Sequence, residues 1–550
     1  MDEKSKFNGQ RQPDDIHAAD VPSQPEVNPI DHGMFHDTLL NNHIAKTHPQ
    51  PTSDPLDPLN WSRFQKNAIL SIVIYFLFTY ITTTTVPSFP EIQTRFDISY
   101  SQVNWTVAIP ALGLAVGPLF WSSLSDIYGR RSIFILGTIV SLIATIGVSV
   151  ANTYGGYMAG RFFQGFGVSP ASTVGMAVVN DMFFDFERGQ KLGLWVLAID
   201  SGLLLGPTFG GFLDLVSESW INWFNSILFA MLLVFELFFM PETLYPRNLM
   251  LQKMPKEEPF LNDIEKNPGK PTEKEEPPTD IFTELKRTKT LFFINYRPVP
   301  GVCHPKPWDS ITRFFMTFRY PVVAISILGY CFLWYWWVLS VITMVPAAYV
   351  NYTPLIQGLL FLGLFLGTLF SEVLFSGSLS DYIVARLAKK NGGVRTAEMR
   401  LWLAYPAIIL TAVGLIVWGI SIDKGYHWMV GQVALFLFAS GIQIGNTVTS
   451  SYIVDSYPLQ SMSVVTFYAV FLNLSAFIDP FFIASWQSKS GWAWCFTAQA
   501  LITLIGGTVV FASLQKFGGK MREKAPQPSW VNPEFDSEPQ PVDLNISSGP

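Results

Sequence analysis

Charged residues are scarce in this chain of 550 residues, where Asp, Glu, Lys and Arg together make up 14%. A soluble protein usually carries about 25% charged residues. The chain is also 49% hydrophobic, and its mean hydropathy is +0.28. Most of the charge lies in residues 1–60, 242–320 and 516–550, and many apolar runs between them reach the roughly 20 residues that cross a bilayer. This composition excludes an ordinary soluble protein and indicates a polytopic membrane protein.

Cysteine is also scarce, and several catalytic signatures are missing. Cys303, Cys331 and Cys495 lie far apart, so they form neither a disulfide framework nor a zinc spacing. The sequence has no GxxxxGK[ST] phosphate-binding loop, no cluster of His and Cys ligands and no nucleophile elbow. We therefore expect a protein that is not an enzyme, with no catalytic residue, ATP use, cofactor, metal ion or nucleic-acid partner.

Twelve apolar runs are long enough to span a membrane, and a polar break divides them six and six. The first six lie near residues 66–87, 103–123, 132–151, 156–180, 192–213 and 220–240. The second six lie near residues 321–346, 355–377, 400–420, 427–453, 461–485 and 492–514. We predict an all-α membrane protein with twelve transmembrane helices in two six-helix bundles.

The polar segments divide the chain into five parts. We expect the bundles at 61–241 and 321–515, disordered tails at 1–60 and 516–550, and a mostly disordered linker at 242–320. The linker is rich in Pro, Glu and Lys and buries too little apolar surface to fold alone. Its last forty residues have room for a short amphipathic helix at the membrane surface. The first sixty residues lack the apolar core of a signal peptide, so the first span would act as an uncleaved insertion signal.

Lysine and arginine in the short loops set the expected orientation. Three loops carry nine of these residues: Arg130, Arg131, Arg188, Lys191, Arg386, Lys389, Lys390, Arg395 and Arg400. The loops on the other side carry three: Arg95, Lys424 and Lys489. The first set therefore faces the cytoplasm, together with both termini and the linker.

The stretch "DSGLLLGPTFGG" begins with Asp200, about eight residues into the fifth span. At 1.5 Å per residue this carboxylate lies roughly 12 Å deep, near the bilayer midplane. The other acids in apolar spans, Glu236, Glu372, Asp455 and Asp479, lie nearer the span ends. An ionisable group at the midplane is costly, so Asp200 is a candidate to bind and release a proton. The alternative is a carboxylate held by neighbouring hydroxyls that locks the helix packing.

Glycines follow Asp200 at a helical spacing. Gly202, Gly206 and Gly210 are four residues apart and share one helix face, with Gly211 next. Small residues at this spacing let two helices approach closely in lipid. Pro207 removes a backbone donor and bends the helix. We expect a close, bent seam with a neighbouring helix, which serves either as a pivot or as a purely structural contact.

Arg161 is the one basic residue well inside an apolar span, and Gln164 lies three residues on, near the same face. A buried guanidinium needs acceptors and does not lose its proton. Three roles stay open: tuning the proton affinity of a carboxylate such as Asp200, bonding the backbone of the fifth span, or acting as a static post between helices.

Charged residues mark the loop after the second span, where "SSLSDIYGRR" (122–131) contains Asp126, Gly129, Arg130 and Arg131. In the second half "GSLSDYIVAR" (377–386), with Asp381, occupies the equivalent place. A duplicated six-span unit is a recurring transporter plan. The charges predict a latch that closes one conformation and breaks in the other. The plain alternative is that the arginines only keep this loop in the cytoplasm.

The expected cavity wall is aromatic and mildly polar. Aromatic walls with few polar groups suit bulky apolar or amphipathic ligands, including cations that bind ring faces. The alternative is that the Trp and Tyr residues anchor the span ends at the membrane interface. The candidate cavity residues are Tyr80, Gln164, Trp334, Trp337, Gln443, Asn446, Tyr468 and Asn473.

These motifs together resemble the major facilitator superfamily over about residues 60–515. "LSDIYGRR" looks like the family's loop 2–3 motif, although Ser122 stands where glycine is usual and Ile127 where a basic residue is common. "GRFFQGFG" is similar to the span-4 motif whose arginine is tied to proton coupling, and "GLLLGPTFGG" to the span-5 motif of antiporters. "DPLDPLNWSRFQK" and "PETLYPR" further resemble the fungal twelve-span drug:proton antiporter group. The resemblance implies that two six-helix bundles rock between inward and outward states.

We therefore expect a proton-coupled exporter of small organic molecules, such as a drug, toxin or secondary metabolite. It would act as a monomer in the plasma membrane, with protons, substrate and the lipid bilayer as partners. Two alternatives stay open. One is uptake of a polyamine-like cation or another nutrient on the same fold, and the other is a non-transporting sensor.

Overall fold

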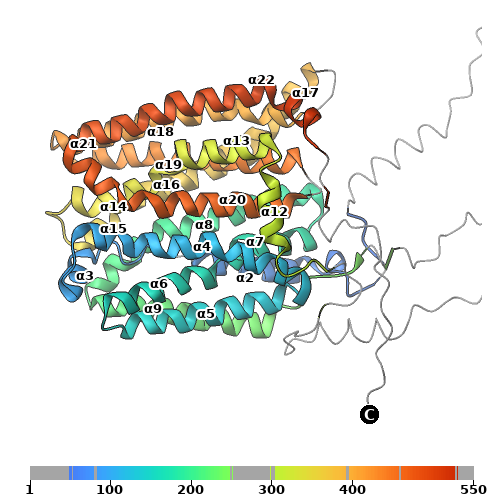
Figure 1. Ribbon diagram of the computed structural model, residues 1–550, viewed down its shortest axis with the longest axis horizontal. Coiled ribbons are helices and arrows are strands. Elements are labelled where there is room, and N and C mark those ends of the chain that lie inside the picture. The colour runs from blue at the N-terminus through green and yellow to red at the C-terminus, as the bar shows by residue number, and fades with distance from the viewer. Residues whose placement is uncertain are drawn as a thin grey trace, which may run out of the picture. The chain divides into compact units, whose positions relative to one another are not determined.

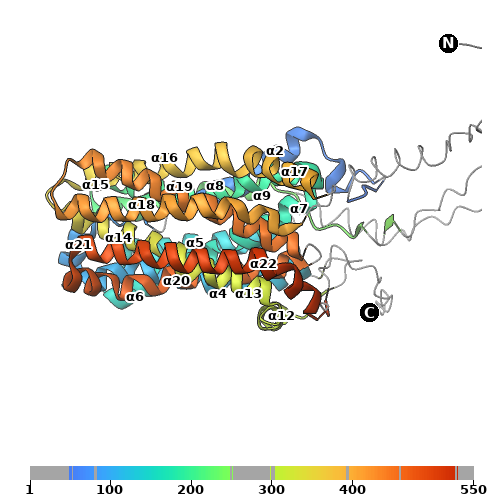
Figure 2. The same ribbon diagram turned by 90° about the horizontal axis from the view of Figure 1, so that it is seen from above.

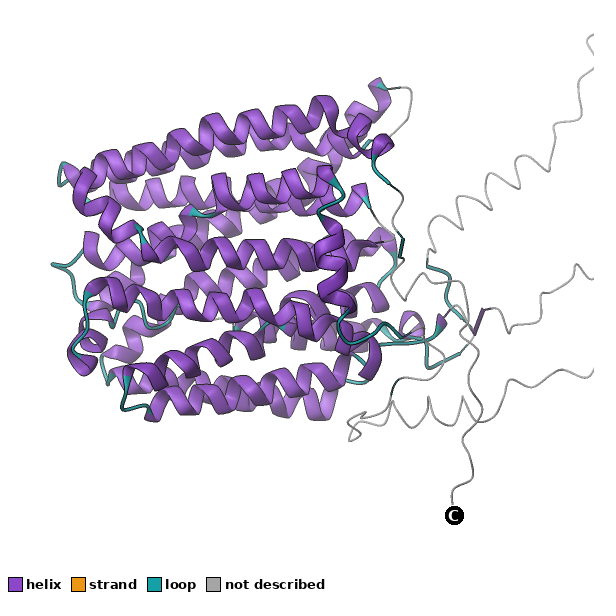
Figure 3. Cartoon of the chain, in the orientation of Figure 1, coloured by secondary structure: helices purple, strands orange, loops and turns teal. Residues whose placement is uncertain are grey.

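The computed structural model divides into two units, residues 1–50 and 51–550, and the account below concerns the second. The residues that it describes are 49–52, 54–79, 83–247, 250–251, 298, 304–391, 396–457, 460–526 and 529–530. Within them the chain forms helices, turns and loops without a strand (Figure 3).

Eleven helical segments of the described residues are long and apolar enough to cross a membrane. In the first half these are α4 (Tyr100–Tyr128), α5 (Arg130–Val150), α6 with α7 (Tyr154–Val168 and Pro170–Met182), α8 (Asp185–Asp214) and α9 (Glu218–Phe239). In the second half they are α13 with α14 (Pro321–Tyr330 and Trp337–Ala348), α15 with α16 (Pro354–Leu359 and Leu362–Ser371), α18 (Ala404–Asp423), α19 (Trp428–Ser456), α20 (Ser461–Ile478), and α21 with α22 (Ile483–Ile502 and Thr508–Lys524). They correspond to expected spans two to twelve.

The first expected span begins with α2 (Arg63–Phe78). Its 16 residues are about 24 Å long, which is short of the roughly 30 Å of a hydrocarbon core. Residues 80–82, which follow it in the sequence, lie outside the described residues, and a short helix, α3 (Phe89–Phe96), precedes α4. The membrane fold is therefore confirmed, while the twelfth span stays an expectation.

The two halves of the described chain lie side by side. In Figure 1 the first half (blue to green) fills the lower part and the second half (yellow to red) the upper part. They meet along two seams, in which α8 packs against α15 and α16, and α4 packs against α20. A hydroxyl bond crosses the first seam from Thr208 to the carbonyl of Gly358 (2.9 Å), and the rings of Trp105 and Phe481 meet in the second at 5.3 Å.

Local sequence signals explain where several helices begin and end. Ser99 and Gln102 form a capping box at the start of α4, in which each side chain bonds the other's backbone N–H. Gly129 alone separates α4 from α5, and its φ of 94° is a backbone conformation that favours glycine. A Cβ at this position would also meet the Glu242 carboxylate.

Apolar side chains are distributed as in a membrane protein. Ile143, Ile505 and Trp494 are among the large apolar residues that stay exposed, at 66%, 63% and 70%. Polar residues such as Ser141 and Thr411 are instead fully buried inside the bundles. A surface of this kind matches lipid, because lipid offers no partner for a polar group.

Folded structure extends past several expected boundaries. Pro58–Asn60 forms a turn of 3₁₀ helix in the expected tail, and Asp57 before it is fully buried. A short helix, α12 (Asp309–Thr317), lies in the part of the linker where an amphipathic piece was expected. The last helix, α22, runs nine residues past the expected end of the bundle at 515, to Lys524. Short stretches at the edges of the predicted tails and linker, such as residues 49–52 and 242–247, are also described, and most of the rest falls outside the described residues.

Candidate functional site

Asp200 lies in the middle of α8 and is 8% exposed. Its carboxylate is hydrogen-bonded to the side-chain amide of Asn446 on α19 and lies within electrostatic reach of Glu372. Both of these residues belong to the second half of the chain. The buried acid of the first half therefore faces the interface between the two halves, rather than a partner in its own bundle.

Glu372 is held at the same interface. Its Oε2 accepts a bond from Gln443 Nε2 (2.7 Å) and one from the Thr447 hydroxyl (3.3 Å), both on α19. Gly193 on α8 faces this carboxylate, and a Cβ there would come within 2.7 Å of Glu372 Oε1. A π-helical segment, Glu372–Leu379, begins at this acid, and such turns are frequent at functional sites.

A tyrosine completes the arrangement. The Tyr468 hydroxyl donates to Asn446 Oδ1 (2.6 Å), so Asn446 links Tyr468 to Asp200. The rings of Tyr468 and Tyr330 are stacked, with centroids 6.3 Å apart. We call Asp200, Glu372, Gln443, Asn446 and Tyr468 the midplane cluster. It draws on α8, the end of α16, α19 and α20, and three of its members were predicted as cavity residues.

Arg161 is fully buried and bonds three acceptors with three different nitrogens. Nε donates to the carbonyl of Thr106 (3.1 Å), Nη1 to Gln164 Oε1 (2.9 Å) and Nη2 to the Thr85 hydroxyl (3.2 Å). Thr106 is four residues before Pro110, and a proline leaves the carbonyl at that position without its helical donor. Arg161 therefore fills a gap in α4. The backbone partner lies on the second span, where the sequence pointed to the fifth.

Pro207 leaves the same kind of gap in α8. The carbonyl four residues earlier, that of Leu203, accepts a bond from the Thr83 hydroxyl at 2.5 Å. The turn of α8 before Pro207 is thus tied to the segment that follows α2.

The glycines after Asp200 allow close packing against two neighbouring segments, the first span and α15. A Cβ at Gly202 would come within 2.7 Å of the carbonyl of Phe78, and one at Gly210 would strike the carbonyl of Thr84. A Cβ at Gly211 would come within 2.7 Å of the carbonyl of Pro354 in α15. Gly206, on the first face by its spacing, is buried. One glycine face therefore packs on the first span, and Gly211 packs on the opposite half of the molecule.

The predicted latch residues meet at the end of α4. Arg130 forms an ion pair with Asp126, and its Nε lies 3.5 Å from Asp181 Oδ2 at the end of α7. Glu242, after α9, accepts bonds from the backbone N–H groups of Arg130 (2.8 Å) and Arg131 (3.2 Å). Burial raises the pKa of Glu242, while these N–H groups and the Arg130 charge act to lower it. Arg131 itself donates to the carbonyl of Leu237 (2.9 Å).

A related network lies at the equivalent end of the second half. Arg400, before α18, pairs with Asp455 at the end of α19 (2.6 Å), and Arg522 at the end of α22 pairs with Glu398 (2.6 Å). The predicted counterpart Asp381 lies in α17 (Ser380–Lys390), but its side chain lies outside the described residues. In each half, therefore, an arginine at the start of one span pairs with an aspartate at the end of the next span.

Two motifs far apart in sequence form a clasp at the same end, which we define as Thr52, Asp54, Asp57, Tyr245 and Arg247. Asp57 pairs with Arg247 (3.1 Å), and the Tyr245 hydroxyl donates to Asp54 (2.8 Å). Burial alone would raise the pKa of Asp57, but the charge and hydrogen bonds of Arg247 and two backbone N–H groups hold it below its ordinary value.

Several predicted cavity residues lie elsewhere. Trp334 is fully buried and donates to the Thr411 hydroxyl (2.9 Å), and Trp337 donates to the Thr503 hydroxyl (2.9 Å). Both indoles therefore pack inside the second bundle with their only donor in use, unlike a cavity wall. The Asn473 amide bonds the carbonyl of Ala469 (2.8 Å) on its own helix. Gln164 serves Arg161, and Tyr80 lies outside the described residues.

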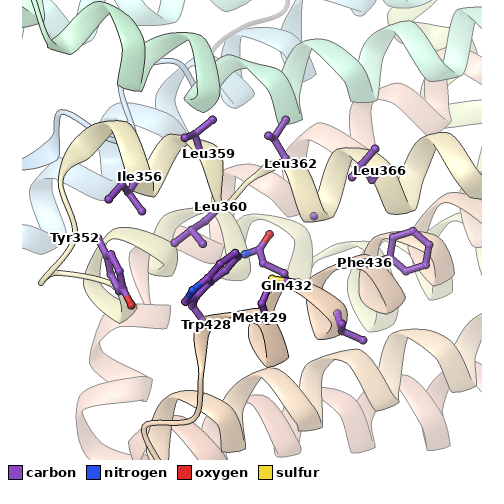
Figure 4. A pocket seen from close by; sticks show the side chains of 12 residues that line it. Tyr352, Ile356, Leu359, Leu360, Leu362, Leu366, Trp428, Met429, Gln432 and Phe436 are labelled. Atoms are coloured by element: carbon purple, nitrogen blue, oxygen red, sulfur yellow. The ribbon is translucent and has the colours of Figure 1, made fainter.

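A separate groove of about 670 Å³ opens between the outer parts of α15, α16 and α19 (Figure 4). Its walls are almost entirely apolar, and side chains such as Ile356, Leu366 and Val433 stay 40–55% exposed. Gln432 lies near its centre (Figure 4). The groove shares no residue with the midplane cluster, and lipid hydrocarbon fits its lining.

Sequence reasoning missed Asp181 as a partner of the latch, although a signal was present. "VVND" (178–181) and "YIVD" (452–455) end corresponding spans of the two halves, and each aspartate pairs with an arginine at the start of the preceding span. Glu372 was noted only as an acid near the end of a span. Its depth along the sequence gave no hint that it faces Asp200.

A duplicated helical plan with a buried polar cluster between its halves is the plan of a membrane transporter. The chain belongs to the Major Facilitator Superfamily, because the sequence pattern of that family matches residues 71–478.

Curated relatives support the same assignment. The chain is 27% identical over 446 residues to "MFS transporter cpaT" of Aspergillus oryzae, covering 80% of this chain and 85% of that protein. It is 26% identical over 411 residues to "Probable efflux pump mfs2" of Aspergillus flavus, covering 74% and 90%. It is 24% identical over 456 residues to "Efflux pump radE" of Floropilus chiversii, covering 82% and 80%.

Among solved structures, the xylose transporter XylE from E. coli, in a partially occluded inward-open conformation, has a similar fold. The TM-score is 0.54 at 14% sequence identity, and the match covers 82% of this chain and 99% of that one. At this identity the likeness concerns the fold alone.

Proposed function

We propose that the protein exports small organic molecules in exchange for protons, and that Asp200 carries the proton. The observation that carries this proposal is the position of the Asp200 carboxylate, buried between the halves and bonded to Asn446 of the opposite half. A charged group at that place senses both the proton and the relative position of the bundles.

The midplane cluster suggests how a proton could change the conformation. A charged Asp200 attracts the Asn446 amide across the interface and repels the Glu372 carboxylate. A proton on Asp200 removes the repulsion and weakens the bond to the amide. Either change alters how tightly Asp200 is held against Asn446 of the second half, a contact that we expect to change when the bundles rock. Arg161 supports this movement as a post within the first bundle.

The export direction rests on the span-5 resemblance and on the two relatives named as efflux pumps. The orientation, with both termini in the cytoplasm, rests on the nine basic loop residues against three. The proposal places a monomer in the plasma membrane with a drug, toxin or secondary metabolite as cargo. The alternative is uptake of a cationic nutrient, and measuring the direction of transport distinguishes it from export.

The test compares Asp200→Asn with wild type in cells that lack their own efflux pumps, using a panel of fluorescent organic compounds. Wild type should lower the accumulation of at least one compound, and collapsing the proton gradient should abolish this effect. Asp200→Asn should reduce gradient-driven export at least tenfold, because the amide cannot take up a proton. Asp423→Asn, at an exposed site, is the matched control. Gradient-driven export by Asp200→Asn at the wild-type rate would refute the coupling role, and increased accumulation by wild type would favour uptake.

A further inference from the structure

The short helix α12 lies across the bundle rather than along it. In Figure 1 it crosses the transmembrane helices, and Figure 2 shows it nearly end-on at the bundle surface beside α4 and α13. Its ring partners Phe467 and Phe471 lie six and ten residues into α20, and its partner Ser123 lies five residues before the end of α4. α12 therefore lies on the flank of the bundle, toward the end at which α4 ends and α20 begins.

One face of α12 is anchored to the first half of the chain. The Ser310 and Ser123 hydroxyls are 2.6 Å apart, and the backbone N–H of Ser310 also donates to Ser123 (2.9 Å). His304, ahead of the helix, lies 3.3 Å from the carbonyl of Asp126. The anchor on α4 is thus five residues from the end of that helix and next to the latch.

The same helix is anchored to the second half through aromatic rings. Phe314 lies 5.1 Å from Phe467 and 5.6 Å from Phe471, and Phe318 lies 4.9 Å from Phe467, between ring centroids. α12 therefore holds α4 and α20 at the same time, where the two halves meet.

Exposed rings and positive charges lie on α12 and on the residues that flank it. Trp308, Phe315 and Phe318 are 60%, 63% and 44% exposed. Lys306 and Arg319 are exposed and Arg313 is half-buried, and no carboxylate of the described residues pairs with any of the three. Asp309, the acid at the start of the helix, accepts the backbone N–H of Lys306 (2.9 Å). Exposed rings close in sequence to unpaired cations are typical of helices that lie in the interface of an anionic membrane.

We propose that α12 and its flanking residues bind the headgroups of anionic phospholipids, with Lys306, Arg313 and Arg319 on the phosphates and Trp308 and Phe315 among the acyl chains. Because α12 joins α4 to α20, a bound headgroup favours the state in which these helices are held together. This second step rests on the proposed function, whereas the lipid site does not.

The lipid site is tested with the purified full-length chain in a non-ionic detergent. Fluorescence anisotropy follows the binding of a labelled short-chain phosphatidylserine, and labelled phosphatidylcholine is the neutral probe. Wild type should bind phosphatidylserine more tightly. The triple variant Lys306→Gln/Arg313→Gln/Arg319→Gln should weaken that binding by about a hundredfold, because each basic residue near an anionic surface contributes about 1 kcal/mol. Binding of phosphatidylcholine should not change.

The matched control removes the same charge from α17, at the same end of the bundle, as Arg386→Gln/Lys389→Gln/Lys390→Gln. It should leave phosphatidylserine binding within threefold of wild type. An equal loss in both triple variants would mean that the binding reflects only the general positive charge of this end, and the proposal would fail. It would also fail if the α12 variant, with an unchanged thermal unfolding midpoint, bound phosphatidylserine like wild type. Neither outcome bears on proton coupling at Asp200.

Discussion

Arg161 joins three elements with three separate nitrogens, and this geometry decides which substitutions it tolerates. Lysine keeps the charge but offers one compact ammonium in place of a planar fork. We predict that Arg161→Lys lowers the free energy of unfolding by about 2 kcal/mol, because at least one buried acceptor such as the Thr106 carbonyl loses its donor. The thermal unfolding of the purified protein measures this effect.

A different result would change the role of Arg161. If Arg161→Lys unfolded at the wild-type temperature but shifted the pH dependence of export, the guanidinium would act on the proton rather than on α4. Thr106 gives a second control, because its carbonyl needs a donor only while Pro110 follows four residues later. Restoring the helical donor with Pro110→Ala should therefore reduce the penalty of Arg161→Lys.

The sequence showed where a residue lies along its own span, but not which residues of other spans it contacts. Hydropathy put Asp200 near the middle of its helix, and the structure has it there, buried. Nothing in the local pattern says that Asn446 and Glu372 face it, because the rotation and order of helices in a bundle are set by packing between distant segments. The packing of the Trp334 and Trp337 indoles inside the second bundle could not be read from the sequence for the same reason, since a buried tryptophan and a cavity tryptophan have the same sequence neighbours.

At the scale of elements, the clasp explains why "DPLDPLNW" and "PETLYPR" occur together. Each motif supplies one side of the ion pair between Asp57 and Arg247, and Arg247 also donates to the carbonyl of Asp181 at the end of α7 (3.2 Å). The clasp therefore ties the ends of α2, α7 and α9 together. Sequence reasoning used both motifs as marks of resemblance and did not predict that they touch.

The clasp has a defined pH dependence. Arg247 and two backbone N–H groups hold the pKa of Asp57 below its ordinary value of 3.8, so the folded state favours the ionised form. The contribution to stability is complete above pH 3.8 and is lost as the pH falls through the lower, folded value. We predict that Asp57→Asn lowers the unfolding midpoint by the same amount from pH 5 to pH 8. The gap to wild type should shrink only below about pH 4. A gap that shrinks between pH 5 and pH 7 would contradict the lowered pKa.

At the scale of the whole molecule, the two seams between the halves differ in chemistry. The seam of α8 with α15 is close backbone packing through Gly211 and Gly358, where an added Cβ would meet a carbonyl. The seam of α4 with α20 is lined by rings and bridged at one end by α12. The first resembles a pivot, since backbones in contact rotate with little change in buried area. The second is a contact between side chains, which can part without disturbing the backbone, so we expect this seam to act as a gate. The sequence predicted a close seam along Gly202, Gly206 and Gly210, and Gly202 and Gly210 face the first span. It did not predict the contact with Gly358, nor that α12 bridges the second seam.

Fixing α12 covalently to the first half should therefore stop the molecule from alternating between its inward and outward states. The Ser123 and Ser310 hydroxyls are 2.6 Å apart, so cysteines at these two positions come within reach of a disulfide. The double variant Ser123→Cys/Ser310→Cys is made in a background that carries Cys303→Ser. Once oxidised it should keep its fold but lose at least nine-tenths of export, because α4 could no longer move relative to α12. Reduction should restore it, and the single Ser310→Cys variant should respond to neither treatment. Export that continued at the wild-type rate with the disulfide fully formed would mean that α12 travels with α4 throughout the cycle, and that the gate opens between α12 and the rings of α20 instead.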